Sequence, residues 1–482
     1  MNKIPSPKVA FIPILIMVVA LYFTISTFGS DSLNGANQIV LLMTSAICTF
    51  IGMTFYKIPW ADFENGIVRN IQGVASALII LLIIGALSGA WMISGVVPTL
   101  IDYGMMIIHP KFFLASACLI SIIVSVMTGS SWTTIATIGI ALMGIGQAQG
   151  YSEGWIAGAI ISGAYFGDKI SPLSDTTVLA SSVTKTPLFR HIRYMMITTV
   201  PSIVITFIIF IVAGLSGEVS EQSQIAEISA TLNTRFNITP WLLVVPAVTG
   251  ILIAKRVPSI VTLFISTLLA AVAAIVFQPE TLAELAGRSQ NTIYEAVMTM
   301  LSTGTNLESG NAMVNDLIAT RGMSGMLNTI WLILCAMCFG GAMTASGMLG
   351  SITAMFGRLM KNTFSMVGST VCSGLFLNLA TADQYISIIL TGDMFRKTYE
   401  AKGYESCVLS RTVEDSVTVT SVLVPWNSCG LTQSTVLNVS TLTYLPYCFF
   451  NYLSPIMSIL VAAIGYKIAR IGKNNEVQEM AN

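Results

Sequence analysis

The chain has 482 residues, of which 54% are hydrophobic and 10% charged, and its mean hydropathy is +0.78. Soluble domains carry about 25% charged residues, so this composition excludes an ordinary soluble protein and predicts a chain that crosses a lipid bilayer many times. The 23 basic residues balance the 23 acidic ones. A neutral chain gives no indication of a nucleic-acid partner, because such partners are recognised by a basic surface.

Eight stretches are apolar and approach the roughly 20 residues that a helix needs to cross the hydrocarbon core. Two lysines precede the first stretch, which is long enough to span and shows no cleavage site. We therefore interpret it as a transmembrane helix and not as a signal peptide. The predicted spans are residues 9–28, 37–55, 72–94, 194–214, 241–254, 257–277, 327–348 and 448–469.

Two further zones, 96–183 and 352–440, are apolar but interrupted by Gly, Pro, Ser and Thr. Irregular backbone is tolerated at membrane depth only where protein or an aqueous cavity covers it. These zones therefore predict discontinuous helices and re-entrant hairpins. The expected fold class is an all-α polytopic membrane protein.

The positions of Lys and Arg near the predicted helix ends indicate the orientation. Basic residues flank the first helix on its N-terminal side, follow the second helix, and recur at the end of the last, whereas the 29–36 loop has none. This pattern predicts that both termini lie in the cytoplasm. The residues that carry it are Lys3, Lys8, Lys57, Arg69, Lys467, Arg470 and Lys473.

The chain also repeats itself at a nearly constant spacing. The segment 89–95 (GAWMISG) matches 341–347 (GAMTASG) at an offset of 252, and 127–134 stands opposite 380–387 at an offset of 253. Opposite orientations of the 72–94 and 327–348 helices would make the halves inverted repeats, an architecture of secondary transporters. The same comparison leaves open whether Asp415 stands opposite Asp168 or Asp175.

This organisation divides the chain into four parts. We expect a first inverted repeat over 1–215, an extracytoplasmic linker over 216–238, a second inverted repeat over 239–473 and a cytoplasmic tail over 474–482. In both repeats, broken helices should meet near the middle of the membrane.

Two polar stretches, 162–182 and 409–430, carry charges within these apolar zones. An ionised side chain at membrane depth costs roughly 3 kcal/mol on insertion scales, so it usually marks a pathway or a binding site. The candidate ion- or proton-binding residues are Asp168, Asp175, Asp383, Glu414 and Asp415. The candidate hydroxyl or amide ligands are Thr128, Ser130, Ser131, Ser171, Thr176, Thr381, Ser416 and Asn427.

A small hard cation such as Na⁺ prefers carboxylate, hydroxyl and carbonyl oxygens. We therefore expect Na⁺ at Asp175, Asp415 and Thr176. A carboxylate that binds either Na⁺ or H⁺, but not both, is the simplest antiport mechanism. Two cations, Lys169 and Arg411, have two interpretations: ion pairs with Asp168 and Glu414, or contact with the carboxylate of a transported solute.

At these residues the chain resembles the NhaC-type Na⁺/H⁺ antiporter family. The resemblance covers nearly the whole chain and is carried by the segments 167–177 (GDKISPLSDTT), 381–385 (TADQY), 414–421 (EDSVTVTS) and 425–427 (PWN). It implies a fold of inverted repeats with paired hairpins. Similar proteins include Na⁺/H⁺ antiporters, Na⁺-lactate/malate-proton exchangers and amino-acid carriers.

The expected function is exchange of Na⁺ for H⁺ across the cytoplasmic membrane, by a transporter and not an enzyme. The alternative is a Na⁺- or H⁺-coupled carrier of a small organic acid, such as malate or lactate, or of an amino acid. We expect no cofactor, with Na⁺ as the transported or coupling ion, and leave a homodimer open. An ion channel and an intramembrane aspartyl protease are disfavoured, because the chain has neither an obvious filter motif nor the sequence context of paired catalytic aspartates.

Overall fold

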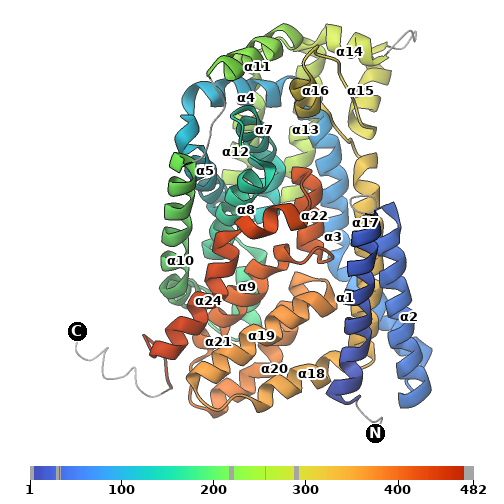
Figure 1. Ribbon diagram of the computed structural model, residues 1–482, viewed down its shortest axis with the longest axis vertical. Helices are drawn as coiled ribbons and strands as arrows, with labels where there is room; N and C mark the ends of the chain where they lie inside the picture. The colour runs from blue at the N-terminus through green and yellow to red at the C-terminus, as the bar shows by residue number, and fades with distance from the viewer. Residues whose placement is uncertain are drawn as a thin grey trace.

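The computed structural model describes residues 5–28, 32, 34–216, 222–255, 257–286 and 292–471. Within these residues the fold is helical and contains no strand, only an isolated antiparallel bridge between Tyr404 and Arg470. Most helices run along the long axis of the molecule (Figure 1). The prediction of an all-α polytopic membrane protein is confirmed at this level.

Eight helices in the described residues are long and apolar enough to cross a membrane. Six of the predicted spans fall on these helices, whereas 241–254 and 448–469 fall on pairs of helices bent by 90° and 55°. The spanning helices are α1 (Pro7–Phe28), α2 (Ala36–Tyr56), α3 (Trp60–Ile93), α5 (Phe113–Thr128), α10 (Leu188–Ser216), α13 (Ser259–Phe277), α17 (Leu327–Ala345) and α19 (Thr363–Thr381).

The remaining helices are shorter and complete the interrupted zones and the two ends of the bundle. They are α4 (Val96–Ile107), α6 (Ser131–Thr134), α7 (Ile140–Ala148), α8 (Glu153–Ile170), α9 (Asp175–Val183), α11 (Gln222–Arg235), α12 (Val244–Ala254), α14 (Pro279–Ala286), α15 (Thr292–Ser302), α16 (Ala312–Ile318), α18 (Met348–Arg358), α20 (Gln384–Ala401), α21 (Ser406–Val413), α22 (Ser428–Leu437), α23 (Thr441–Tyr444) and α24 (Phe449–Ile464). Two π-helical turns, Ile135–Gly139 and Glu414–Thr418, continue α6 and α21.

Two spanning helices, α5 and α19, lie in zones that the sequence analysis treated as interrupted. Their serines made the zones look broken, yet Ser121 and Ser125 of α5 are buried, and the Ser125 hydroxyl donates to the Ala164 carbonyl of α8 at 2.5 Å. Small residues let the two helices approach closely. A Cβ atom at Gly163 would lie only 2.2 Å from the Cys118 carbonyl oxygen.

The long helix α3 packs against α17 in the opposite direction. A Cβ atom at Gly66, near the start of α3, would lie 2.8 Å from the Gly341 carbonyl oxygen near the end of α17. Gly85, near the end of α3, faces Met326 just before α17 begins. The two helices accordingly lead into α4 and α18, which lie at opposite ends of the molecule (Figure 1).

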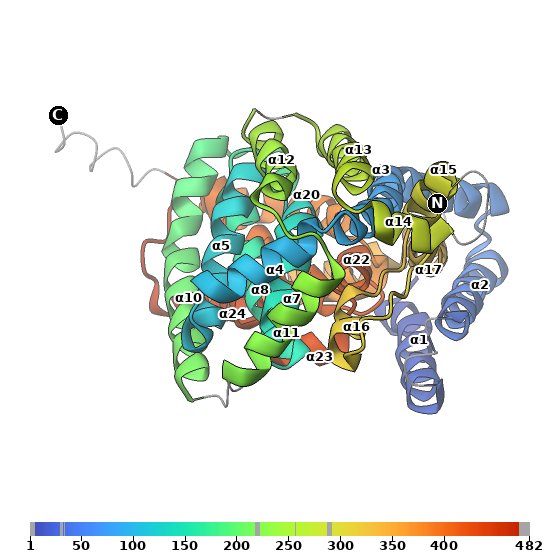
Figure 2. The same ribbon diagram turned by 90° about the horizontal axis from the view of Figure 1, so that it is seen from above.

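One end of the molecule is covered by short helices. Seen from above, α4 and α11 lie across this end (Figure 2), and the Ser229 hydroxyl of α11 donates to the Asp102 carboxylate of α4. The helices α14, α15 and α16 lie at the same end, opposite the end that holds α18 (Figure 1).

Both α5 and α19 end in the same local structure. After Thr128 and Thr381, the next residues, Gly129 and Ala382, are left-handed, with φ of 64° and 57°. Ser130 and Asp383 then cap α6 and α20 by accepting a backbone N–H with their side chains. Each threonine hydroxyl also accepts from the N–H of the cap residue, at 3.1 and 3.2 Å. In each of these pairs, the residue numbers of the two members differ by 253.

The same spacing continues through the next helices. α8 begins at residue 153 and α21 at residue 406, and the two helices that follow the interruptions, α9 and α22, begin at 175 and 428. Ser174 and Asn427 cap these two helices through their side chains. The helix boundaries over 128–175 and 381–428 therefore correspond without an insertion.

Candidate functional site

The first cavity, of about 440 Å³, lies where the interrupted helices of the first half meet α3 and α20. Its walls contain two carboxylates together with hydroxyl and amide groups, so it offers many oxygen ligands. It is lined by Gly73, Ser76, Ala77, Ile80, Thr128, Gly129, Ser130, Trp132, Asp168, Leu173, Asp175, Thr176, Leu179, Ser259, Gln384 and Tyr385.

Asp168 lies in the last turn of α8, and its side chain is 5% exposed. One carboxylate oxygen accepts two hydrogen bonds from Ser131: from the backbone N–H at 3.0 Å and from the hydroxyl at 2.8 Å. Ser131 is the first residue of α6, whose unpaired backbone N–H groups favour a negative charge. The break between α5 and α6 therefore holds the Asp168 carboxylate in place at the cavity wall.

Asp175 differs from Asp168 because its side chain is exposed and, among the described residues, accepts no hydrogen bond. It is the first residue of α9, directly after the Ser174 cap. The neighbouring Thr176 is buried, and its hydroxyl contacts both Ser174, at 3.0 Å, and the Glu414 carboxylate, at 3.2 Å. Thr176 thus connects the cavity wall to an acidic group in the second half of the chain.

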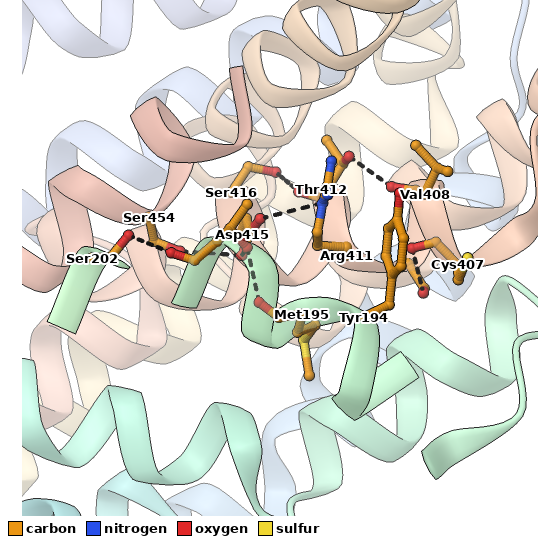
Figure 3. A network of polar contacts seen from close by, with 12 residues as sticks. Tyr194, Met195, Ser202, Cys407, Val408, Arg411, Thr412, Asp415, Ser416 and Ser454 are labelled. Carbon is orange, nitrogen blue, oxygen red and sulfur yellow. Dashed lines mark hydrogen bonds and ion pairs between the residues drawn. The ribbon is translucent and has the colours of Figure 1, made fainter. Parts of the chain in front are cut away.

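Behind the cavity, Lys169 and Asp415 form a fully buried ion pair. The Asp415 oxygen in this pair also accepts from Thr198 of α10 at 3.1 Å and from Ser454 of α24 at 3.3 Å. Ser454 in turn accepts from Lys169 at 2.9 Å. Figure 3 shows Asp415 between Ser454 and Arg411. The ion pair joins α8 to the π-helical turn Glu414–Thr418, and its hydroxyl partners connect it to α10 and α24.

Arg411 is fully buried beside this pair but has few partners. Its Nε lies 3.9 Å from the second oxygen of Asp415, and its guanidinium stacks over the Tyr194 ring at 4.8 Å (Figure 3). Among the described residues none of its three nitrogens makes a hydrogen bond. A guanidinium has five N–H donors, so Arg411 retains unused capacity to bind an anion or carbonyl.

The predicted ion pairs between sequence neighbours are wrong. Lys169 pairs with Asp415 and not with Asp168, and Arg411 faces Asp415 and not Glu414. Consecutive residues of an α-helix point about 100° apart, so Asp168 faces the cavity while Lys169 points into the bundle. Glu414 begins the π-helical turn, and its carboxylate meets Thr176.

The other predicted ligands separate into two groups. Thr128 and Ser130 line the first cavity, and Ser131 binds Asp168. The remaining groups do not belong to the lining and form hydrogen bonds within the protein: Ser171 to Val126, Ser416 to Thr412, Asn427 to Asn378, Thr381 to Ser387, and Asp383 to Ile386 and Ser428. Asp415 is also absent from the lining, whereas Asp175 and Thr176 belong to it.

Four residues of this region were missed as candidates. Thr198 and Ser454 bind the buried ion pair, Tyr194 stacks on Arg411, and Tyr385 lines the cavity. Thr198 and Ser454 are two of several buried polar residues in the apolar helices α10 and α24, and a hydroxyl in such a helix does not by itself separate a ligand from a packing residue. Tyr385 lay within the quoted segment 381–385 and could have been named.

Comparisons with known proteins identify relatives of this chain. The profile of the Na⁺/H⁺ antiporter family matches residues 163–466. The chain is 34% identical over 425 residues to the Na⁺/H⁺ antiporter NhaC of Bacillus subtilis, covering 88% of this chain and 91% of that protein.

Two further relatives have other names. The chain is 33% identical to the malate-2H⁺/Na⁺-lactate antiporter of Bacillus subtilis, over 96% of this chain and 97% of that protein. It is 32% identical to the arginine/ornithine antiporter ArcD of Halobacterium salinarum, over 100% of this chain and 96% of that protein. The profile match and the extent of these similarities show that this chain belongs to the Na⁺/H⁺ antiporter family.

Proposed function

We propose that this protein exchanges Na⁺ for H⁺ across the cytoplasmic membrane. The observation that carries the proposal is the first cavity, in which Asp168 and Asp175 face the same space as the hydroxyls of Thr128, Ser130 and Thr176. Carboxylate and hydroxyl oxygens suit Na⁺. The family membership and the names of the bacterial relatives support the same assignment.

In this proposal Asp175 is the exchanging group and Asp168 the fixed one. Asp175 has no hydrogen-bond partner among the described residues, so its carboxylate is available to take either Na⁺ or a proton. Asp168 is held by Ser131 and adds a second negative charge. Na⁺ would lie at Asp175 and Thr176. Asp415 would contribute indirectly, through the buried ion pair that it forms with Lys169 behind the cavity.

Glu414 is the candidate for a second proton site. It is fully buried, and among the described residues only one of its two oxygens has a partner, the Thr176 hydroxyl. The second oxygen, which has no partner among the described residues, can carry a proton. Because Thr176 also lines the cavity, movement of this hydroxyl towards a bound Na⁺ would release its hydrogen bond to Glu414.

We also propose that the chain is built from two inverted repeats, over 1–215 and 239–473, with broken helices paired near the middle of the membrane. The opposite directions of α3 and α17 and the constant offset of 253 support this. At that offset Asp415 stands opposite Ser162, so neither register considered from the sequence is retained. The linker 216–238 would lie outside and both termini in the cytoplasm; the tail 474–482 lies outside the described residues.

The test is proton flux in proteoliposomes under an imposed Na⁺ gradient. We expect Na⁺ to drive proton movement in the wild type and not in Asp175→Asn. The matched control is Asp62→Asn, an exposed carboxylate in the first turn of α3, which should behave as the wild type. Equal proton flux in Asp175→Asn and wild type would refute the assigned role of the cavity.

A second candidate function is supported by Arg411. Its guanidinium is buried and without a hydrogen bond among the described residues, and such a group binds a carboxylate through paired N–H donors. A carrier of a small organic acid or an amino acid would use it to hold the solute. Lys169 does not offer a binding site for the solute's carboxylate, because its ammonium group is already paired with Asp415.

Uptake of labelled lactate, malate and arginine by the same proteoliposomes separates the two functions. The carrier function predicts uptake in the wild type that is lost in Arg411→Gln. If none of the three solutes is taken up while Na⁺ drives proton flux, Na⁺/H⁺ exchange alone stands. Folding of Arg411→Gln is followed by size-exclusion chromatography.

A further inference from the structure

A second cavity, of about 660 Å³, lies between α1, α2, α17 and α22. No carboxylate belongs to its described lining, which consists of amide, hydroxyl and apolar groups with one arginine. The lining is Leu21, Ile25, Ser32, Asn34, Asn37, Arg321, Gly325, Asn328, Thr329, Leu332, Pro425, Trp426, Leu431, Ser434, Thr435, Asn438, Val439, Ser440, Thr441 and Leu442.

The two cavities are built from corresponding elements. The first is lined by α3, by the turn before α9 and by α9 itself; the second is lined by α17, by the turn before α22 and by α22. Equivalent positions of the two halves line both cavities. At the offset of 252 that relates α3 to α17, Ser76 corresponds to Asn328; at the offset of 253 that relates the later helices, Leu173 corresponds to Trp426.

The cavities open towards opposite ends of the molecule. Because α3 and α17 run in opposite directions, the corresponding residues that line the two cavities lie towards opposite ends of the molecule. The second cavity includes Ser32 and Asn34, which precede α2, and residues 440–442, which follow α22. It therefore lies towards the end covered by α14–α16, the end to which the distribution of basic residues assigns the extracytoplasmic side (Figure 1).

A pair of hydrogen bonds lies next to residues that line each of the two cavities. The Ser428 hydroxyl, at the start of α22, donates to the Asp383 carboxylate at 3.1 Å, and the Ser428 N–H donates to the Ala382 carbonyl at 2.8 Å. On one side of this contact Gln384 lines the first cavity, and on the other side Trp426 lines the second. The contact ties the cap of α20 to the first turn of α22.

The equivalent contact in the first half is open. At the offset of 253, Ser130 corresponds to Asp383 and Asp175 to Ser428, so the acid and the hydroxyl have exchanged places. Both Ser130 and Asp175 line the first cavity, and no hydrogen bond joins them in the described structure. The molecule thus has the same acid–hydroxyl pair twice, closed at one cavity and open at the other.

We propose that the second cavity is the extracytoplasmic half of the transport path, and that these two pairs are its alternating gates. This rests on the proposed function and adds the path and gates to it. The Asp383–Ser428 contact closes the second cavity from the ion site. A Ser130–Asp175 contact forms when the first cavity closes and the second opens.

The chemistry of the second cavity fits the passage of a hydrated cation. Amide and hydroxyl oxygens can replace water around Na⁺, and without a carboxylate they do not hold it tightly. Arg321 is exposed, where solvent and salt screen its charge. The carboxylates that bind the ion remain at the first cavity, so both gates serve one ion site.

The first experiment measures access to the two cavities with a membrane-impermeant maleimide in the full-length protein. The reporters are Ser434→Cys in the second cavity and Ser76→Cys in the first, and peptide mass spectrometry separates their labelling from that of the eight native cysteines. Each reporter is combined with Ser428→Ala. Because this removes a hydrogen bond to a carboxylate, we expect labelling of Ser434→Cys from outside to rise by about tenfold and labelling of Ser76→Cys from inside to fall.

The matched control is Thr432→Ala, one turn further along α22. Among the described residues its hydroxyl donates only to the Ser428 carbonyl of its own helix, at 2.7 Å, so both labelling rates should stay at the wild-type level. If Ser428→Ala leaves both rates unchanged, or if Thr432→Ala raises labelling equally, the assigned gate is overturned.

A second variant keeps the test decisive if Ser428→Ala does not fold. Oxidation of the double variant Ser130→Cys, Asp175→Cys should join the two positions by a disulfide, which mass spectrometry detects as a linked peptide. Absence of this link under oxidation overturns the alternating gates. Na⁺-driven proton flux in the wild type is measured separately: its absence refutes the proposed function, whereas its presence with failed gate tests refutes the gates alone.

Discussion

Lys169 and Asp415 lie 246 residues apart in the chain and form an ion pair in which both side chains are fully buried. The pair joins the end of α8 to the π-helical turn after α21. Each interrupted helix carries one member, so the geometry of either interruption depends on the other. Thr198 and Ser454 complete the site and connect it to α10 and α24.

Removing one member of this pair should be costly. Lys169→Met leaves the Asp415 charge buried with Arg411 at 3.9 Å as its remaining cationic neighbour, and breaking a buried pair costs about 3–5 kcal/mol. We expect a lower thermal unfolding midpoint in detergent and poorer expression. Lys402→Met, at an exposed lysine, is the control and should match the wild type. Equal midpoints for both variants would show that the pair does not stabilise the fold.

The close packing of α5 on α8 predicts opposite effects at two glycines. In Gly163→Ala the new methyl group would lie 2.2 Å from the Cys118 carbonyl oxygen, and such overpacking costs about 1–3 kcal/mol. In Gly368→Ala, within α19, nothing lies within 4 Å of the new methyl group, and the better helix propensity should contribute about 0.5–1 kcal/mol. Unfolding midpoints that move in the same direction would contradict this packing.

The hydrogen bond from Thr176 to Glu414 should affect exchange more than folding. Thr176→Val keeps the shape of the side chain but removes the hydroxyl that links the cavity to Glu414. We expect Na⁺-driven proton flux to fall by about tenfold, the size of a lost hydrogen bond to a charged group. Thr184→Val is the comparison, because that hydroxyl donates to the Ala180 carbonyl of its own helix at 2.7 Å. Normal flux in Thr176→Val would remove Glu414 from the mechanism.

The ring of Tyr194 should stabilise the buried Arg411 guanidinium. A buried cation–π contact contributes about 1–2 kcal/mol, and Tyr194→Phe retains the ring while losing the hydroxyl contacts to Lys467 and Ala469. Tyr194→Leu loses both. We therefore expect Tyr194→Leu to unfold at a lower temperature than Tyr194→Phe, and identical midpoints would exclude a contribution from the ring.

The helical class could be predicted from the sequence, because it depends on local patterns. Long apolar runs identify spanning helices, and the polar segment 167–177 places Asp168, Asp175 and Thr176 within one interrupted region. The helices α5 and α19 were missed because their hydroxyls resemble those of a loop. Burial of Ser125 against α8 is a tertiary fact that composition does not reveal.

The partners of the charged residues were predicted poorly. Sequence proximity favoured Lys169 with Asp168, but helix rotation directs these neighbours to different sides, and the true partner comes from the other half of the chain. The residue that stands opposite Asp415 in the first half was hard to identify for a related reason. Aligning Asp415 with either Asp168 or Asp175 requires a gap between the two repeats. The helix caps Ser174 and Asn427, which carry no charge, align the two halves without one.

The central claim is that the carboxylates of the first cavity carry the exchanged cation. The most direct measurement is uptake of radioactive Na⁺ by proteoliposomes under an imposed pH gradient, for the wild type, Asp168→Asn, Asp175→Asn and the control Asp62→Asn. The account predicts uptake that depends on the pH gradient in the wild type and in Asp62→Asn, and none in the two cavity variants. Uptake at the wild-type rate in both cavity variants would contradict it.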